Sequence, residues 1–520
     1  MEHLLSCLLM NSPGLTDIVF ESLSGASLTL IAAHCGATLR SIKAETTCRC
    51  SEEVARMCEV SPNLVHLGLD LLVDCDEVVL AAVCHCPLIE AVPTHDITDV
   101  ALDALSGIHT LKELKISSHS DLCSSGAIQR VLRANPDIVD IAVDIGSCID
   151  DSFVSLIGAS FAHLKSLCLG GCGDPFAALS GPALRDLFRS CPLLERLSIR
   201  QSEYVISKAS LRALFQSCPH LSDLSLELAE PPESTDDDEA ILDPRFAPPP
   251  LTDLYISGGG SVATRLLGDL FSRGTSIRVL GLHDCMQVVD DTIISLAPAC
   301  PLLEDLDISQ DESGFVSKAA LRVLFQSCRH LADMSLCFED VSPAEADDGD
   351  DLDVSCPSLI WLVVTGDGLA DDTLRAIFTH CTGLQHVQLH ECHMITDKAV
   401  TALAHSCHKL VELGVYDCKM LTIAAPLEVA SCCPALVDLS LYDMPLGDDA
   451  LIRLSRCPNL VSLVISLFNT DPSKCQITKT GVLAVVNKCK KLELFAIQGF
   501  SEKISRMLER LDDAKRARRL

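Results

Sequence analysis

Residues 381–410 read CTGLQHVQLHECHMITDKAVTALAHSCHKL. The stretch opens with an L-x-x-L-x-L run that ends in alternating apolar and polar residues, as a short β-strand does: Leu384, Val387 and Leu389. After a turn at Cys392, apolar residues recur at helical spacing, and Thr396 stands where a helix N-cap is expected. The stretch therefore predicts one strand followed by one helix.

Imperfect copies of this unit recur along the whole chain. The first leucine-type position of each copy falls at Leu15, Leu39, Leu64, Ile89, Leu111, Ile138, Leu164, Leu194, Leu221, Leu251, Ile277, Leu303, Leu331, Leu359, Leu384, Leu410, Leu436, Leu460 and Leu492. The mean step is about 26 residues, and such runs with a period of about 20–29 residues mark leucine-rich repeats. We therefore predict an α/β fold: a leucine-rich repeat solenoid (horseshoe) of about 19 repeats, with parallel strands on the concave face and helices on the convex face.

The repeats leave little room for a second domain. We predict one solenoid over residues 1–500 and a charged capping helix over residues 501–520. Two acidic segments that contain proline, 229–250 and 339–355, replace a helix with a loop. The sequence leaves two interpretations of these loops open: solvated insertions, or acidic contacts for a basic partner.

Composition limits the partners of this chain. The formal net charge is −32, and an acidic surface repels phosphate backbones, so we expect no nucleic acid partner. The N-terminus carries Glu2 instead of a basic region, and no apolar stretch reaches the roughly 18 residues of a membrane span. We expect a soluble protein with no membrane contact, located in the cytoplasm or the nucleus.

The 28 cysteines follow the repeats. More than half lie either three residues before or eight residues after a first leucine-type position, as Cys381 and Cys392 do for Leu384. A small, weakly hydrogen-bonding side chain suits a buried turn, so we interpret these residues as reduced packing thiols. The pair Cys432–Cys433 lacks a second pair at zinc spacing, and we expect no metal and no cofactor.

No enzymatic motif stands out. The run Gly258–Gly260 follows a predicted strand but lacks the spacing of a phosphate-binding or dinucleotide-binding loop. The chain also has no G-x-S-x-G elbow and no H-E-x-x-H pair. We therefore predict that the protein is not an enzyme and that it has no catalytic residues.

The informative positions alternate with the leucines, because these positions face the open side of each strand. Nearly half of the units are acidic just before the second leucine position, and we name four of these residues the acidic stripe: Asp223, Asp253, Asp305 and Asp333. Three of the five Trp and Tyr residues fall on adjacent strands, and such residues are enriched at binding hot spots. We therefore predict a protein-docking or peptide-docking concave patch made of Trp361, His386, Gln388, His390, Glu412, Tyr416, Asp438 and Tyr442.

Residues 381–410 resemble the cysteine-containing subclass of leucine-rich repeats, with the pattern C-x-x-L-x-x-L-x-L-x-x-C-x-x-I-T-D. This resemblance implies an F-box/LRR-like protein that recognises substrates for SCF-type ubiquitin ligases. Only eleven residues precede the first unit, and no F-box is recognisable in them. We predict a non-enzymatic binding scaffold, with ubiquitin-ligase components as candidate partners. Two alternatives remain open: an inhibitor of a basic enzyme that resembles ribonuclease-inhibitor horseshoes, and a regulator that resembles leucine-rich GTPase activators.

Overall fold

The computed structural model describes residues 10–498, apart from residues 11, 13, 21–23, 45–49, 70–74, 118–121, 171–178, 201–205, 229–240, 243–247, 286–288, 311–315, 339–354, 458 and 468–476. The chain forms two compact units, Met1–Leu251 and Thr252–Leu520. Most of the two acidic segments and the whole of the expected capping helix lie outside the described residues, so these expectations stay predictions.

The first unit alternates strands and helices. Its strands are β1 (Asp17–Phe20), β2 (Ser41–Ala44), β3 (His66–Gly68), β4 (Glu113–Ser117), β5 (Asp140–Asp144), β6 (Ser166–Gly170), β7 (Arg196–Arg200) and β8 (Asp223–Leu228). Its helices are α2 (Gly25–Cys35), α3 (Ser51–Glu59), α4 (Asp76–His85), α5 (Asp99–Leu105), α6 (Ser125–Ala134), the short 3-10 helix η1 (Gly146–Cys148), α7 (Asp151–Ser160), α8 (Gly181–Ser190) and α9 (Lys208–Ser217). Strands β1–β3 pair in parallel, as do β4–β8, each strand with the next.

The second unit continues the same alternation with a more regular sheet. Its strands are β9 (Asp253–Gly258), β10 (Val279–His283), β11 (Asp305–Gln310), β12 (Asp333–Phe338), β13 (Trp361–Gly366), β14 (His386–His390), β15 (Glu412–Tyr416), β16 (Asp438–Tyr442), β17 (Ser462–Ser466) and β18 (Leu494–Gln498). Its helices are α10 (Gly260–Phe271), α11 (Val289–Ala299), α12 (Lys318–Ser327), α13 (Asp371–His380), α14 (Asp397–Ser406), α15 (Ala424–Cys432), α16 (Asp448–Leu454) and α17 (Lys479–Lys488). All ten strands pair in parallel in chain order.

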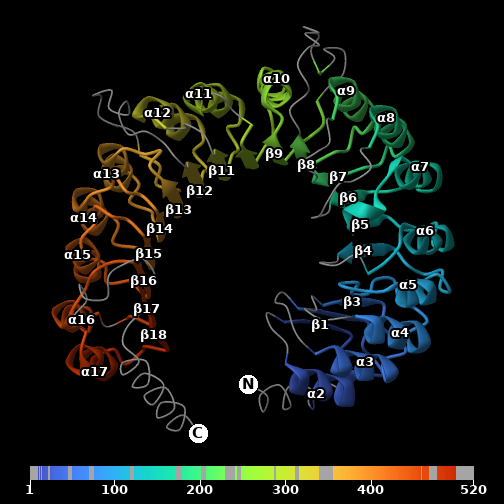
Figure 1. Cartoon of the computed structure of the whole chain (residues 1–520), viewed down its shortest axis with the longest axis horizontal. Coiled ribbons are helices and arrows are strands. Elements are labelled where there is room, and N and C mark those ends of the chain that lie inside the picture. Colours follow the sequence, from blue (N-terminus) through green and yellow to red (C-terminus); the bar gives the residue numbers. More distant parts are fainter. Residues whose placement is uncertain are drawn as a thin grey trace. The chain divides into compact units, whose positions relative to one another are not determined.

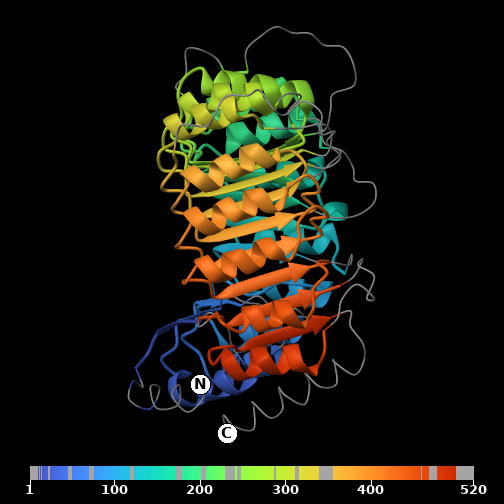
Figure 2. The ribbon, with the colours of Figure 1, turned by 90° about the vertical axis from the view of Figure 1, so that its left-hand side faces the viewer.

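Helices and strands of the second unit lie in two layers. The described helices cover one face of the sheet and leave the other face open (Figure 1). The side view shows these helices stacked one above the next, each beside its own strand (Figure 2). We call the uncovered side the open face.

The leucine-type positions form the core between the two layers. Leu384, Val387 and Leu389 are fully buried, as are Leu403 and Ala404 of α14. A buried aliphatic side chain stabilises a fold by roughly 1.5–3 kcal/mol. The repeated strand-and-helix unit therefore folds because each copy completes the core of its neighbour. This arrangement confirms the predicted α/β solenoid.

Cysteine side chains fill the turns between helices and strands. The Cys407 thiol donates to the backbone carbonyl oxygens of Phe378 at 3.4 Å and Cys381 at 3.5 Å, both in the preceding repeat. Burial raises the pKa of the Cys407 thiol to about 12, so the group stays protonated and unreactive at neutral pH. The cysteines in the described residues are free thiols, and most of them are buried. These contacts agree with the interpretation of the cysteines as packing residues.

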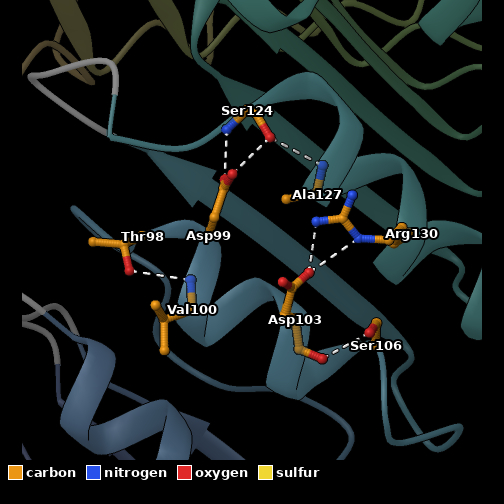
Figure 3. A network of polar contacts seen from close by, with 8 residues as sticks. All are labelled: Thr98, Asp99, Val100, Asp103, Ser106, Ser124, Ala127 and Arg130. Atoms are coloured by element: carbon orange, nitrogen blue, oxygen red, sulfur yellow. Dashed lines mark hydrogen bonds and ion pairs between the residues drawn. The ribbon is translucent and has the colours of Figure 1, made fainter.

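An aspartate at the start of one helix often binds the N-cap residue of the next helix. Figure 3 shows this link between α5 and α6, where the Asp99 carboxylate accepts from the backbone N–H of Ser124 at 2.7 Å and from its hydroxyl at 2.8 Å. The Ser124 hydroxyl oxygen in turn accepts from the Ala127 N–H and caps α6. Equivalent aspartate links join Asp76 to Thr98, Asp151 to Ser180, Asp290 to Ser317, Asp371 to Thr396 and Asp448 to Thr478. Asp397 binds Thr422 in the same way, one residue before the N-cap of α15.

Replacing Asp371 by alanine is expected to lower the free energy of unfolding by about 1–3 kcal/mol. The change removes the acceptors for the Thr396 N–H at 2.7 Å and the Thr396 hydroxyl at 3.0 Å, and so loosens the cap of α14. The neighbouring Asp372→Ala is a matched control, because Asp372 forms only an exposed ion pair with Arg375 and should cost less than about 1 kcal/mol. Urea denaturation of both variants measures the difference, and equal losses would contradict the link.

One expected strand does not form. In the unit that begins at Ile89, only Ala91 and His95 make isolated bridges, to His66 and Ser117 respectively. Pro93 lies between them and has no backbone N–H to donate to a neighbouring strand. The repeat pattern is therefore present in the sequence of this unit, while its strand is reduced to two bridges.

Candidate functional site

The parallel register aligns the residues of the concave patch in two rows. The first row crosses β13–β16 at the start of each strand and contains Trp361, His386, Glu412 and Asp438. The second row lies four residues further along β14–β16 and contains His390, Tyr416 and Tyr442. Gln388 lies between the two rows on β14. All eight side chains alternate with buried residues and are half-buried on the open face.

The first row forms one connected group. The Trp361 and His386 rings stack with their centroids 4.3 Å apart and their planes 16° apart. His386 Nδ1 lies 3.1 Å from Glu412 Oε2, and Gln388 Nε2 donates to Glu412 Oε1 at 2.9 Å. The Glu412 carboxylate therefore holds two side chains of the neighbouring strand in fixed positions, including the imidazole that supports the only tryptophan of the chain.

The second row is a stack of aromatic rings. The rings of His390 and Tyr416 are stacked and nearly parallel, with centroids 4.1 Å apart and an angle of 4° between their planes, and the Tyr442 ring follows at 4.7 Å. Burial lowers the pKa of the His390 imidazole, so this ring is neutral at physiological pH. Burial also raises the pKa of the Tyr416 phenol, which stays protonated. The stack therefore presents uncharged aromatic surface with hydroxyl groups at its edge.

Gly414 makes room for this stack, and sequence reasoning did not identify it. A Cβ atom at Gly414 would lie 2.6 Å from Cε2 of Tyr416, so any side chain there would displace the ring. The available signal was the absence of a side chain at an open-face position that most units fill. The Tyr416 ring leans over its own strand because that position is empty.

The residues of the acidic stripe do not form one continuous row. Asp223 lies on β8 in the first unit, whereas Asp253, Asp305 and Asp333 lie in the second. Asp305 and Asp333 are direct neighbours on β11 and β12, but Asp253 is aligned with Val279. Within the second unit, the register therefore places Asp305 and Asp333 side by side.

Four further polar residues gather beside this pair, and sequence reasoning did not single them out. Asp307 and Ser335 are aligned on β11 and β12, and Tyr255 and His283 lie on β9 and β10. His283 Nε2 lies 3.2 Å from Asp307 Oδ2, which raises the pKa of the imidazole and lowers the pKa of the carboxyl group. All four occupy alternating positions of their strands, which is the signal that could have revealed them.

On the helix side, three side chains with metal-ligand chemistry lie together. Ligand atoms of His405 on α14 and of Glu428 and Cys432 on α15 lie within 4.8 Å of one another. His405 is exposed, and the Cys432 thiol donates to Glu428 Oε1 at 3.6 Å. The Cys432–Cys433 pair does not act as a unit, because Cys433 is buried and bonds backbone carbonyl groups of the preceding repeat. That this chain binds no metal stays a prediction.

The described helices do not include one that is both long enough and apolar enough to cross a membrane.

The sequence is similar to those of F-box proteins from Arabidopsis thaliana. The match to F-box/LRR-repeat protein 9 is 31% identical over 138 residues and covers 25% of this chain and 52% of that protein. The match to F-box protein SKIP19 is 32% identical over 129 residues and covers 24% of this chain and 40% of that protein. The match to F-box/LRR-repeat protein 23 is 29% identical over 134 residues and covers 24% of this chain and 28% of that protein. No family model matches the chain.

The fold of this chain is that of a leucine-rich repeat solenoid. The stacked strand-and-helix units and these matches agree, and they confirm the resemblance to F-box/LRR-repeat proteins that residues 381–410 indicate. The leucine-rich repeat chain spans about half the length, or less, of the curated relatives it matches. Among solved structures, the crystal structure of the Rad7 and Elc1 complex in yeast matches with a TM-score of 0.44 and 18% identity, over 76% of this chain and 83% of that chain.

Proposed function

We propose that this protein is a non-enzymatic scaffold that recognises substrate proteins, or acts as an adaptor, in SCF-type ubiquitin-dependent degradation. The proposal has two supports: the matched relatives are F-box proteins by name, and the open face carries a connected set of aromatic and polar side chains. We further propose that it works in the cytoplasm or the nucleus, with the concave patch as the substrate-docking surface.

The observation that carries this proposal is the fixed geometry of the concave patch. Trp361 is held by His386, which is held by Glu412, and Tyr416 is held between His390 and Tyr442. Side chains that are already ordered lose little conformational entropy when a partner binds. Tryptophan and tyrosine also supply much of the binding energy in protein interfaces. A parallel sheet with neighbouring strands about 4.8 Å apart presents these groups as one surface.

The test is affinity purification of the tagged full chain from cells, followed by mass spectrometry. We expect a Skp-type adaptor and a cullin in the eluate, together with at least one further protein whose abundance increases when the proteasome is inhibited. The variant Trp361→Ala with Tyr416→Ala should retain the ligase subunits and lose that further protein. An eluate that contains a basic enzyme or a small GTPase and no ligase subunit would contradict the proposal.

A further inference from the structure

A pocket lies on the open face beside the concave patch. Its volume is about 300 Å³, and it lies entirely within the second unit. Its polar lining includes Asp305, Asp307 and Asp333, and its aromatic lining is Tyr255 and Trp361. The pocket thus combines three carboxyl groups with the only tryptophan of the chain, and Trp361 is shared with the concave patch.

The register explains how these residues meet. Asp305, Asp333 and Trp361 occupy one row across β11, β12 and β13, so each is a direct neighbour of the next. Neighbouring strands lie about 4.8 Å apart, which brings the Asp305 and Asp333 carboxylates within reach of a single cation. Trp361 then flanks this pair on one side.

Tyr255 flanks the carboxylates on the other side because Gly281 leaves it room. A Cβ atom at Gly281 would lie 2.3 Å from Cδ1 of Tyr255, so the tyrosine ring lies over the glycine. Gly281 is aligned with Asp307 on the next strand. The ring is therefore directed across β10 towards the carboxyl groups, and the pocket has an aromatic side chain at each end.

The charges in the pocket are incompletely balanced. Asp307 is paired with His283 at 3.2 Å, whereas Asp305 and Asp333 have no ion-pair partner among the described residues. Burial, together with the charges of Asp333 and Asp307, raises the pKa of the Asp305 carboxyl group. Burial also raises the pKa of the Asp333 carboxyl group, and the neighbouring His386 opposes this rise in part. A positive group placed between the two carboxylates would relieve this repulsion.

We propose that this pocket binds an arginine side chain of the partner protein, with the guanidinium group held by Asp305 and Asp333 and lying against Trp361. The inference rests on the proposed function and names the chemistry that the docking surface selects. A guanidinium group is planar and always charged, it donates several hydrogen bonds to carboxylates, and it stacks on aromatic rings. A lysine ammonium group offers the charge without the planar fork, so arginine fits the combination of two carboxylates and an indole better.

Trp361 allows a direct test, because it is the only tryptophan of the chain and lines the pocket, so its fluorescence responds to a ligand bound there. The full chain is titrated with a capped tetra-arginine peptide, with a capped tetra-lysine peptide of the same charge and, as a neutral control of the same shape, with a capped tetra-citrulline peptide. We expect a saturable change of fluorescence with the arginine peptide, a response at least tenfold weaker with the lysine peptide, and none with citrulline. Binding should weaken as the pH falls, because protonation of Asp305 and Asp333 removes the charges that hold the cation.

Two variants separate the pocket from the general acidity of the chain. Asp305→Asn with Asp333→Asn should weaken the arginine response at least tenfold. Asp372→Asn is the matched control, because Asp372 is an exposed carboxylate on α13, on the helix side of the sheet and outside the pocket lining, and it should leave the response unchanged. The double variant should also melt no earlier than the wild type, since it removes repulsion between carboxylates.

Three results would overturn the inference: equal affinity of the double variant and the wild type, an equal response to citrulline, or an equal response to lysine. The proposed function has a separate readout. If the chain recovers ligase subunits but its fluorescence does not respond to the arginine peptide, only the proposal of an arginine pocket is overturned. An arginine response in a chain that recovers no ligase subunit would overturn only the proposed function.

Discussion

Replacing Trp361 and Tyr416 together by alanine is expected to weaken partner binding by about 100-fold or more, with little change in stability. Each residue belongs to one of the two ordered rows of the concave patch, and truncation of an aromatic hot-spot residue typically costs about 2 kcal/mol or more. Both side chains are half-buried on the open face and do not belong to the core beneath the sheet. The expected loss is therefore one of affinity.

The measurement is quantitative capture of a partner recovered with the wild-type chain, together with thermal melting of the variant. A control of similar size replaces two exposed apolar residues outside the open face, Ile294 on α11 and Leu302 after it, by alanine. This control should retain affinity. Binding of the Trp361 and Tyr416 variant at wild-type strength would exclude the concave patch as the docking surface.

Replacing Phe378 by alanine is expected to lower the free energy of unfolding by about 3–5 kcal/mol. Phe378 lies on α13, has no exposed surface, and is among the largest fully buried side chains of the described residues. Its backbone carbonyl also accepts the Cys407 thiol of the next repeat. Truncation leaves a cavity at the junction of two repeats, where each unit depends on its neighbour for its core.

Urea denaturation followed by circular dichroism measures this loss. Met420→Ala serves as the control, because Met420 is 58% exposed and its removal should change the free energy of unfolding by no more than about 0.5 kcal/mol. A loss below about 1 kcal/mol for Phe378→Ala would show that the layer between sheet and helices tolerates a cavity at this position.

Much of the fold follows from local patterns. The spacing of Leu384, Val387 and Leu389 predicts a strand with one buried side, and the structure buries all three. Thr396 was expected as a helix N-cap, and its hydroxyl oxygen accepts from the Lys398 N–H. Both predictions depend only on residues close in the sequence. The missing strand near Pro93 is also a local effect, which the repeat pattern concealed because the leucine-type positions are retained.

Contacts between repeats were less accessible to sequence reasoning. Alternation along each strand placed Trp361 and His386 on the open face, but the stack between their rings depends on the register of two strands 25 residues apart. The link from Asp371 to Thr396 is likewise a contact between successive helices. A pattern within one repeat does not contain this information, because it arises from the packing of one repeat on another.

The sequence by itself determined the repeat, the strand-and-helix unit, the buried face and the residues exposed on the opposite face, because hydrophobic spacing sets all of these locally. Only the tertiary structure decided which exposed residues act together. It placed Val279 between Asp253 and Asp305 in their row. It also directed Tyr255 over Gly281 towards Asp307. The physical reason is that side-chain direction depends on the space left by neighbouring strands, and strand register alone brings distant residues to one point.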